Sequence, residues 1–266
     1  MTDTPAGMSY ADYLTLGQLL SAQHPISDLH DEMLFVIIHQ TKELWLKQVI
    51  HELELSLALI RADQLIPVHK SLSRVTRIQA VMTLSWDVLA TMTPADYTSF
   101  REVLGSSSGF QSGQFRQVEY MLGLKDLAHL RYHEEGSDTH GALSRALHAP
   151  SLWDEANAAL SRAGLTLPPD VLTRDWSQPY EPSPAVEEAW THVYRDTARW
   201  WPLYQLAEKL VDVDDAMATW RHKHVITVER IIGLKRGTGG SAGVPYLQST
   251  LSKRAFPELW SLRTRV

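Results

Sequence analysis

The stretch His30–Leu53, HDEMLFVIIHQTKELWLKQVIHEL, decides the fold of this chain because its apolar residues follow a helical period. Such residues recur mostly every three or four positions, among them Leu34, Ile38, Trp45, Val49 and Leu53. This spacing places them along one face of an α-helix, and the pattern continues to residue 61. We therefore predict one long helix over residues 31–61, with Ser27 or Asp28 just ahead of it as the N-cap.

The segments on both sides of this helix are also predicted to be helical. Pro67 opens a second long helix, and Thr93 with Pro94 provides the cap and first residue of another. Asp212 or Asp214 is expected to cap a further helix that ends near residue 232. The remaining predicted helices are residues 15–23, 114–122 and 184–211.

Two glycine-rich segments and one polar region interrupt this pattern. Residues 105–113 and 237–243 contain too many Gly and Ser residues for a stable helix, so both are predicted to be loops. Residues 125–182 are more polar and contain several prolines, and we expect an accessory set of short helices there. No internal repeat or pair of alternating strands is found. The predicted fold class is all-α, a helical bundle in a single domain over residues 1–266.

The composition excludes several functional classes. The 25 Lys and Arg residues against 31 Asp and Glu residues give a net charge of −6, which argues against nucleic acid as a partner. No run of about 18 apolar residues suggests a membrane span. The first residues lack a basic and apolar leader pattern, so a cytoplasmic protein is expected.

Cysteine is absent, and this limits the possible metal chemistry. The 266 residues include 12 His and no Cys, which excludes disulfides, iron–sulfur clusters and thiolate-ligated haem. A redox metal would therefore need His, Asp, Glu, Tyr or Met as its protein ligand.

Two of the histidines lie on predicted apolar helical faces. His224 follows Trp220 by four residues and precedes Val228 by four, whereas His222 falls on a more polar face. His39 lies four residues after Phe35. A histidine in such a place is more often a core residue than a ligand, yet an axial iron ligand needs the same setting. The spacing alone leaves both interpretations open.

A second histidine pair is less suggestive of a metal site. His129 and His133 have the i, i+4 spacing of metal ligands but lie in the polar accessory region, so we interpret them as surface residues. No Glu-x-x-His motif occurs in the chain, which argues against a di-iron centre in a helical bundle.

The loop at residues 237–242 fits a nucleotide-binding pattern only nominally. The sequence GTGGSA matches G-x-G-x-x-A, but a predicted helix rather than a strand precedes it, and no Gly-Lys-Ser/Thr follows. A mobile lid, a clamp on a small ligand or a plain connector are the remaining interpretations. Arg101, just before the other loop, is either a surface residue or a binding group for a carboxylate.

Four segments together resemble one known family. They are HDEMLFVIIHQTKELWLKQVIHEL, FREVLGSSSGFQSGQFR, WRHKHVITVERIIGLKRGTGGSAG and FPELW, and they occur in the order seen in tryptophan 2,3-dioxygenases. The resemblance extends from Tyr10 to Thr264 and is weakest over residues 125–182. It implies an all-helical bundle enclosing b-type haem, with one ferrous haem per subunit in the active form.

The resemblance also implies roles for individual residues. His224 matches the haem iron ligand, and His39 matches the distal histidine that hydrogen-bonds the indole N–H. Arg101 matches the group that binds the substrate carboxylate, and Thr238 the group that binds its ammonium. Other residues implied to contact the substrate are Phe35, Val36, Ile37, Ile38, Tyr97, Tyr10 and Tyr13. Trp86, Ser108 and Gly109 are implied to lie beside the haem.

The activity implied is the addition of both atoms of O2 across the C2–C3 bond of the indole of L-tryptophan. The product is N-formyl-L-kynurenine, the first step of tryptophan catabolism by the kynurenine pathway. A homotetramer, built as a dimer of dimers, is implied, with residues 1–30 as an arm whose tyrosines reach a neighbouring subunit. The alternatives are a sister enzyme acting on a substituted tryptophan and a non-catalytic haem sensor.

Overall fold

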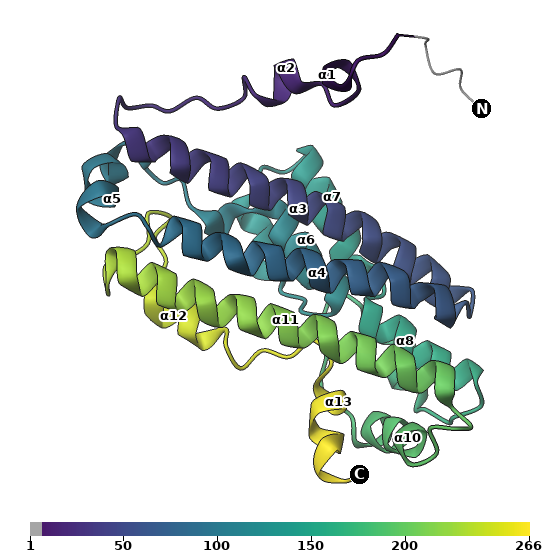
Figure 1. The fold of residues 1–266 in the computed structure, drawn as a ribbon. Coiled ribbons are helices and arrows are strands. Elements are labelled where there is room, and N and C mark those ends of the chain that lie inside the picture. Colours follow the sequence, from purple (N-terminus) through teal and green to yellow (C-terminus); the bar gives the residue numbers. More distant parts are fainter. Residues whose placement is uncertain (1–6) are drawn as a thin grey trace.

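The computed structural model describes residues 7–266, apart from the side chain of Val103, and forms a helical bundle (Figure 1). Three long helices lie side by side: α3 (His30–Arg61), α4 (Leu65–Leu89) and α11 (Trp201–Ile232). α4 packs against both α3 and α11. No strand occurs among the described residues, which confirms the predicted all-α class.

Shorter helices cover one side and both ends of these three. α6 (Gly113–Leu122) and α8 (Leu152–Arg162) pack against α3, and α7 (Asp138–His148) packs against α6 (Figure 1). The other α-helices are α1 (Tyr10–Tyr13), α2 (Leu16–Leu19), α5 (Pro94–Arg101), α9 (Pro169–Leu172), α10 (Pro184–Arg195), α12 (Val244–Ser249) and α13 (Pro257–Ser261). Four short 3₁₀ segments are Glu102–Leu104, Gly109–Gln111, Leu127–Tyr132 and Leu262–Thr264.

The bundle is held mainly by two groups of buried apolar side chains, and a third group of Tyr120, Leu143 and Leu147 joins α6 and α7. The larger group joins α3, α4, α8, α10 and α11, and its members include Leu53, Leu72 and Leu206. The smaller group lies at the α5 end and contains Ile38, Trp86, Leu89, Met92, Phe100 and Ile231. Burial of a Leu or Phe side chain contributes about 1.5–3 kcal/mol, so the two groups together supply most of the stabilisation.

Several predicted helix boundaries are confirmed by local capping. Thr93 accepts a hydrogen bond from the Asp96 backbone N–H, and Pro94 occupies the first turn of α5. Ser112 accepts in the same way at the start of α6. The accessory region 125–182 contains short helices, as predicted.

The N-terminal boundary of α3 differs from the prediction. Its N-cap is Leu29, and no side chain caps it, so the roles predicted for Ser27 and Asp28 are wrong. Instead, the Glu32 carboxylate reaches back from the first turn and accepts from the backbone N–H groups of Ile26 and Ser27, both at 2.8 Å. The carboxylate fixes the entering chain because it satisfies two backbone N–H groups of the segment that precedes the helix.

The predicted helix over residues 184–211 is also wrong. The chain breaks after α10 at Asp196 and restarts at Trp201, where Pro202 occupies the first turn of α11. Proline suits a first turn because it has no N–H to donate. Asp212 and Asp214 therefore lie inside α11 and cap nothing; Asp214 is buried and accepts from the Trp260 indole N–H at 2.9 Å.

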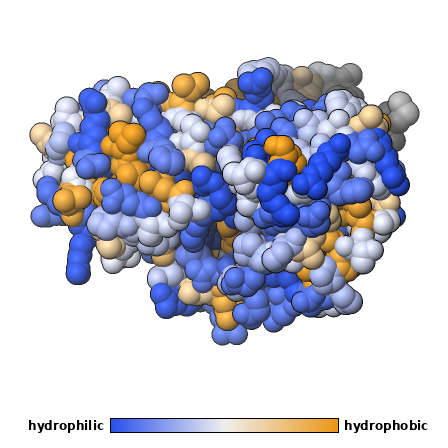
Figure 2. Space-filling model, turned by 90° about the horizontal axis from the view of Figure 1, so that it is seen from below, coloured by the Kyte–Doolittle hydropathy of each residue, from blue (hydrophilic) through white to orange (hydrophobic). Residues whose placement is uncertain are grey.

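The two short helices of the N-terminal arm lie apart from the bundle, whereas Ala22 and Gln23 after them hydrogen-bond Gln40 of α3. α1 and α2 bury no residue, and Figure 1 shows them alongside α3 but separate from it. The predicted helix over 15–23 is reduced to Leu16–Leu19, and α1 was not predicted. Residues 1–6 of the predicted arm lie outside the described residues. The face in Figure 2 is mostly hydrophilic, with apolar residues in separate small patches. No helix within residues 7–266 combines the length and apolar character needed to span a bilayer.

Candidate active site

A single large cavity opens between α3, α4 and α11 and is bordered by both glycine-rich loops. Its empty space is about 1540 Å³, with the open mouth included. Apolar and aromatic side chains from both buried groups form much of the wall, among them Leu46, Met82, Trp86, Met92 and Ile231. A deep, largely apolar cavity with a few polar groups is the usual form of a small-molecule site.

His224 projects into this cavity from α11. Its ring stacks on Trp86 with centroids 4.4 Å apart and planes within 10°, and Trp220 lies 5.1 Å away. Burial lowers the pKa of His224 from 6.5 to about 3, so the ring is neutral at physiological pH. A neutral imidazole facing a dry cavity is the form that ligates a metal. His222, by contrast, is exposed and bonds the Ala218 carbonyl at 2.9 Å.

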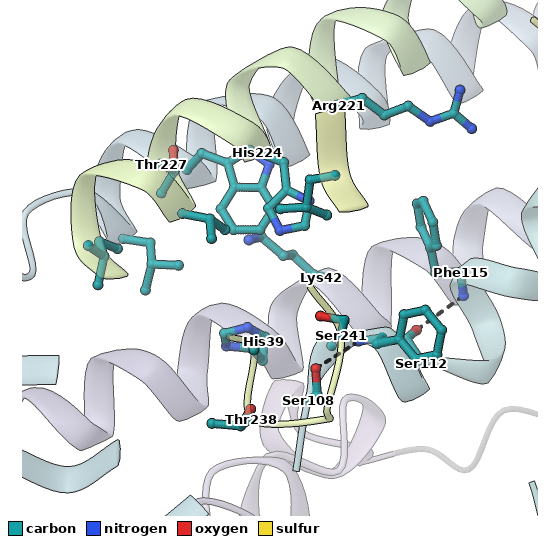
Figure 3. Close-up of a pocket in the computed structure, with 18 of the residues that line it drawn as sticks. His39, Lys42, Ser108, Ser112, Phe115, Arg221, His224, Thr227, Thr238 and Ser241 are labelled. Carbon is teal, nitrogen blue, oxygen red and sulfur yellow. Dashed lines mark hydrogen bonds between the residues drawn. The ribbon is translucent and has the colours of Figure 1, made fainter. Parts of the chain in front are cut away.

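His39 lines the same cavity from α3, as Figure 3 shows. Its Nδ1 lies 2.7 Å from the Phe35 carbonyl oxygen. Because a carbonyl only accepts, Nδ1 carries the proton and donates. Burial lowers the pKa of His39 to about 4, so the ring is neutral and its Nε2 is a hydrogen-bond acceptor. His39 can therefore receive an N–H group from a ligand in the cavity.

Lys42 also lines the cavity, one turn after His39 on α3. The residue is 6% exposed, and its Nζ lies 2.9 Å from the centroid of the Trp86 ring without a hydrogen-bond partner. Burial lowers the pKa of Lys42 to about 7. The indole N–H of Trp86 is likewise buried and unpaired. The wall therefore presents several buried donors without acceptors among the described residues, those of Lys42 and Trp86 included.

The two glycine-rich loops meet at the mouth of the cavity. The Thr238 hydroxyl donates to the Ser107 carbonyl at 2.5 Å, and the Arg101 guanidinium donates to the Arg236 carbonyl. A Cβ atom added to Gly239 would lie 2.6 Å from the Ser108 Cβ, so the loops approach as closely as glycine permits. Arg101 and Thr238 thus each bond the backbone of the opposite loop.

A buried charge network closes one side of the cavity. The Glu119 carboxylate accepts from Arg116 at 2.6 Å and from Arg221 at 3.0 Å. The two guanidinium groups hold the pKa of Glu119 below its usual value despite burial. Arg116 also lies over the Phe110 ring, 4.9 Å from its centroid. Two cations against one carboxylate leave this wall with an excess of positive charge.

Comparison with known proteins places this chain in a family. The family model described as tryptophan 2,3-dioxygenase matches residues 2–266. The chain belongs to the tryptophan 2,3-dioxygenase family. It is 64% identical to the tryptophan 2,3-dioxygenase of Caulobacter vibrioides over 259 residues, which are 97% of this chain and 98% of that relative. It is 51% identical to that of Bacillus thuringiensis subsp. konkukian over 265 residues, which are 100% and 95% of the two chains.

A third relative gives the same picture. The tryptophan 2,3-dioxygenase of Bordetella pertussis is 52% identical over 262 residues, 98% of this chain and 92% of the relative. The resemblance inferred from four sequence segments is therefore confirmed over the whole length. Tryptophan 2,3-dioxygenases depend on haem, so the cavity must be tested against that group.

The residues of the cavity fit haem. His224 offers a neutral imidazole, and one imidazole suffices because the macrocycle supplies the other ligands to the iron. Trp86, Leu46 and Met82 offer apolar contact to the macrocycle. The unpaired Lys42 ammonium and the cationic wall suit its carboxylates. No group of three or more His, Asp or Glu side chains arranged for a metal ion is found within residues 7–266.

The structure brings most, but not all, of the predicted site residues together in this tryptophan 2,3-dioxygenase family member. Those that line the cavity are Phe35, His39, Trp86, Tyr97, Ser108, Gly109, His224 and Thr238. Arg101 lies at the mouth, bonded to the loop that carries Thr238.

The other five predicted contacts lie outside the wall of this cavity. Val36, Ile37 and Ile38 fall on other faces of α3, and Ile38 is packed in the smaller apolar group. A run of consecutive residues cannot share one face, because each helical residue turns the chain by about 100°. Tyr10 and Tyr13 lie on the arm, 76% and 75% exposed.

The surface interpretation of the second histidine pair is wrong for His129. That residue is 8% exposed and packs against the Phe110 ring, with centroids 5.6 Å apart. Its Nε2 lies 3.5 Å from the Asp126 carboxylate. His129 therefore supports Phe110, which lines the cavity. The polar residues around His129 in the sequence gave no sign of this burial.

Sequence reasoning missed Lys42 and the network of Arg116, Glu119 and Arg221. Lys42 follows His39 by three residues, the spacing of neighbours on one helical face, so its position beside the histidine could have been found. Arg221 likewise precedes His224 by three residues. For Arg116 and Glu119, no spacing in the sequence indicated a place beside the site, because Arg221, which bonds Glu119, lies on α11, far away in the sequence.

Proposed function

We propose that the chain binds one haem b, with His224 as the axial ligand to the iron, and acts as a tryptophan 2,3-dioxygenase. It would add both atoms of O2 to the indole of L-tryptophan: the C2–C3 bond breaks, each carbon gains one oxygen, and N-formyl-L-kynurenine results. The observation that carries this proposal is that two neutral histidines, His224 and His39, line one cavity. The chain that holds them is 64% identical to a relative named tryptophan 2,3-dioxygenase.

Haem supplies the iron, ferrous in the active form, that activates O2. His39 holds the indole: its Nε2 accepts the indole N–H, because its Nδ1 proton is committed to the Phe35 carbonyl. We assign His39 to positioning rather than to proton removal, since the indole N–H is a very weak acid and a base of pKa about 4 is weak. Phe35, with its ring 4.2 Å from His39, provides an apolar contact for the substrate ring.

The amino-acid end of the substrate is assigned to the loops at the mouth. Arg101 binds the carboxylate and the Thr238 hydroxyl accepts from the ammonium, after each exchanges its present backbone carbonyl for the ligand. The two groups come from opposite loops, so a zwitterion bound by both would hold the loops together and exclude water. Tyr97, also in the wall, packs 6.0 Å from Phe35 and extends the apolar slot.

The assembly forms part of the same proposal. Tyr10 and Tyr13 would complete the pocket of a neighbouring subunit in a homotetramer. The arm carries further apolar residues that are exposed within residues 7–266, Leu20 at 71% and Ile26 at 72%. Residues 1–266 would form one haem-binding domain with 1–30 as this arm and 125–182 as accessory helices. The cytoplasmic location also stays a prediction.

The deciding experiment is spectroscopic and chemical. Purified protein loaded with haem and reduced without oxygen should show a Soret band that shifts when L-tryptophan is added. Admission of O2 should then give the near-ultraviolet absorbance of N-formylkynurenine. Full haem loading without product from L-tryptophan contradicts the assigned substrate, and methylated or halogenated tryptophans would then be tried as substrates of a sister enzyme.

A further inference from the structure

Lys42 is a buried cation that the proposed reaction does not use. It is 6% exposed, lines the cavity with His39 and His224, and its Nζ has no hydrogen-bond partner among the described residues. Figure 3 shows the Lys42 side chain reaching from α3 toward His224 and away from Thr238. Its Nζ lies 2.9 Å from the centroid of the Trp86 ring.

The chain satisfies a buried lysine elsewhere, so the isolation of Lys42 is informative. Lys125 is 4% exposed, and its Nζ donates to the carbonyls of Ala146, Leu147 and Ala149 at 2.5, 3.0 and 2.7 Å. Burial of a charge without a partner opposes folding, and natural structures retain one where it serves a ligand. Lys42 therefore points to an anion that is not part of the chain.

The two carboxylates that line the cavity, those of Glu43 and Glu119, are already engaged. Glu43, the next residue, accepts from the Gln114 side chain at 2.8 Å. Glu119, also in the cavity wall, is held by Arg116 and Arg221. Neither is free to neutralise the ammonium, so a bound molecule must bring the acceptor.

We propose that the Lys42 ammonium binds a carboxylate that a ligand carries into the cavity. This inference rests on the proposed function, which offers two sources: the two propionate groups of haem and the carboxylate of tryptophan. The amino acid already has Arg101 and Thr238 at the mouth, which favours haem as the source. The long, flexible lysine side chain can turn from the centre of the cavity to the edge of a bound macrocycle.

The test compares Lys42→Met with Lys47→Met, a matched control on the exposed face of the same helix. Apoprotein is titrated with haem, and binding is followed at the Soret band. Loss of one charge-assisted pair should weaken haem binding about ten- to hundredfold in Lys42→Met and leave Lys47→Met unchanged. Lys42→Arg, which keeps the charge, should restore most of the affinity.

Haem with both carboxylates as methyl esters separates the ion pair from packing. The ester should bind wild type and Lys42→Met equally well if Lys42 pairs with a propionate. If haem affinity is unchanged but Lys42→Met weakens L-tryptophan and not tryptamine, which has no carboxylate, the carboxylate site stands and its source is the amino acid.

Two results overturn the inference. If the wild-type protein binds haem but Lys42→Met changes neither haem affinity nor L-tryptophan affinity, the inference about Lys42 is wrong and the proposed function stands. A wild-type protein that binds no haem contradicts the proposed function as well. Urea unfolding of the apoprotein guards against misfolding: Lys42→Met removes an unpaired buried charge and should be at least as stable as wild type.

Discussion

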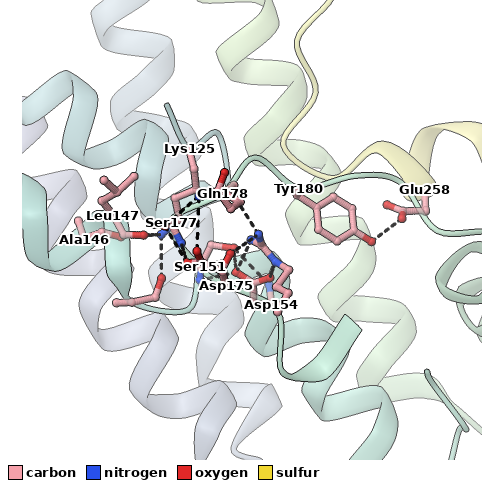
Figure 4. A network of polar contacts seen from close by, with 12 residues as sticks. Lys125, Ala146, Leu147, Ser151, Asp154, Asp175, Ser177, Gln178, Tyr180 and Glu258 are labelled. Atoms are coloured by element: carbon pink, nitrogen blue, oxygen red, sulfur yellow. Dashed lines mark hydrogen bonds and ion pairs between the residues drawn. The ribbon is translucent and has the colours of Figure 1, made fainter. Parts of the chain in front are cut away.

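Two regions of the molecule differ in whether a buried lysine has hydrogen-bond partners. One is the wall of the cavity, with Lys42. The other, here called the junction, is the polar cluster of Lys125, Asp154, Arg174, Tyr180 and Glu258. At the junction, shown in Figure 4, Lys125 donates to three carbonyls and Arg174 donates to the Asp154 carboxylate at 2.9 Å. Tyr180 donates to Glu258 at 2.5 Å nearby. In the cavity, Lys42 and the Trp86 indole N–H are buried without acceptors. Lys125 therefore has its acceptors within the chain, whereas Lys42 has none among the described residues.

The largest effect expected from breaking the cavity is the loss of haem. His224→Ala removes the only predicted iron ligand, and haem affinity should fall more than about 100-fold, beyond the loss typical of an outer-shell partner. His222→Ala is the matched control, because that exposed ring bonds Ala218 and not the cavity. A Soret titration of both variants decides the matter. Haem loss in His222→Ala with retention in His224→Ala shows that the assigned ligand is wrong.

The second effect lies at the junction. Lys125→Met leaves three carbonyls, one buried and two partly buried, without this donor and should lower the free energy of unfolding by about 2–4 kcal/mol. Lys42→Met should not lower the free energy of unfolding, because the Lys42 ammonium makes no hydrogen bond that could be lost. Urea unfolding of the two apoprotein variants measures this difference directly. Equal destabilisation by both substitutions contradicts the contrast between the two regions.

The third effect concerns the amino-acid end of the substrate. Arg101→Leu should raise KM for L-tryptophan about 10- to 100-fold, the equivalent of one charge-assisted hydrogen bond of about 1.5–3 kcal/mol, and leave the haem spectrum intact. Arg145→Leu, on the accessory helix α7, is a control with the same change of charge. An unchanged KM in Arg101→Leu removes this residue from the substrate site.

The fourth effect is on pH-dependent stability of the apoprotein. The pKa of His39 is lowered by burial from 6.5 to about 4, so between these values the unfolded chain binds a proton that the folded chain refuses. Stability is full above pH 6.5 and falls as the pH drops toward 4, by at most on the order of 3 kcal/mol from this group. Unfolding measured at pH 7 and pH 5 should show a smaller loss in His39→Leu than in wild type. An identical loss in both would rule out this cause.

The smallest effect is at the contact between the loops. Gly239→Ala places a Cβ within 2.6 Å of the Ser108 Cβ and should weaken L-tryptophan binding a few-fold, since the loops must separate. Gly141→Ala on α7, where the nearest atom lies at 3.4 Å, should have no effect. Difference spectra of the haem-loaded proteins with L-tryptophan provide the measurement. Unaltered affinity in Gly239→Ala means that closure of the loops does not support binding.

Sequence reasoning succeeded where the cause is local. The cap at Thr93 follows from residues within three positions of it, Pro94 and Asp96. It failed at the break between α10 and α11, because Pro202 starts a helix as readily as it ends one. It also failed at His129, whose burial depends on Phe110 from another segment.

The chain by itself determined the helical periods, the two glycine-rich loops and the apolar setting of His224, since these depend on neighbours three or four residues away. It also carried the family motif, which the full-length comparisons confirm. Only the tertiary structure decided that Lys42, Trp86 and His224 meet, because they lie on three different helices. That meeting depends on which buried faces pack together, and no local hydrogen-bonding pattern encodes the choice. The same packing left Lys42 without an acceptor in the cavity and gave Lys125 three at the junction.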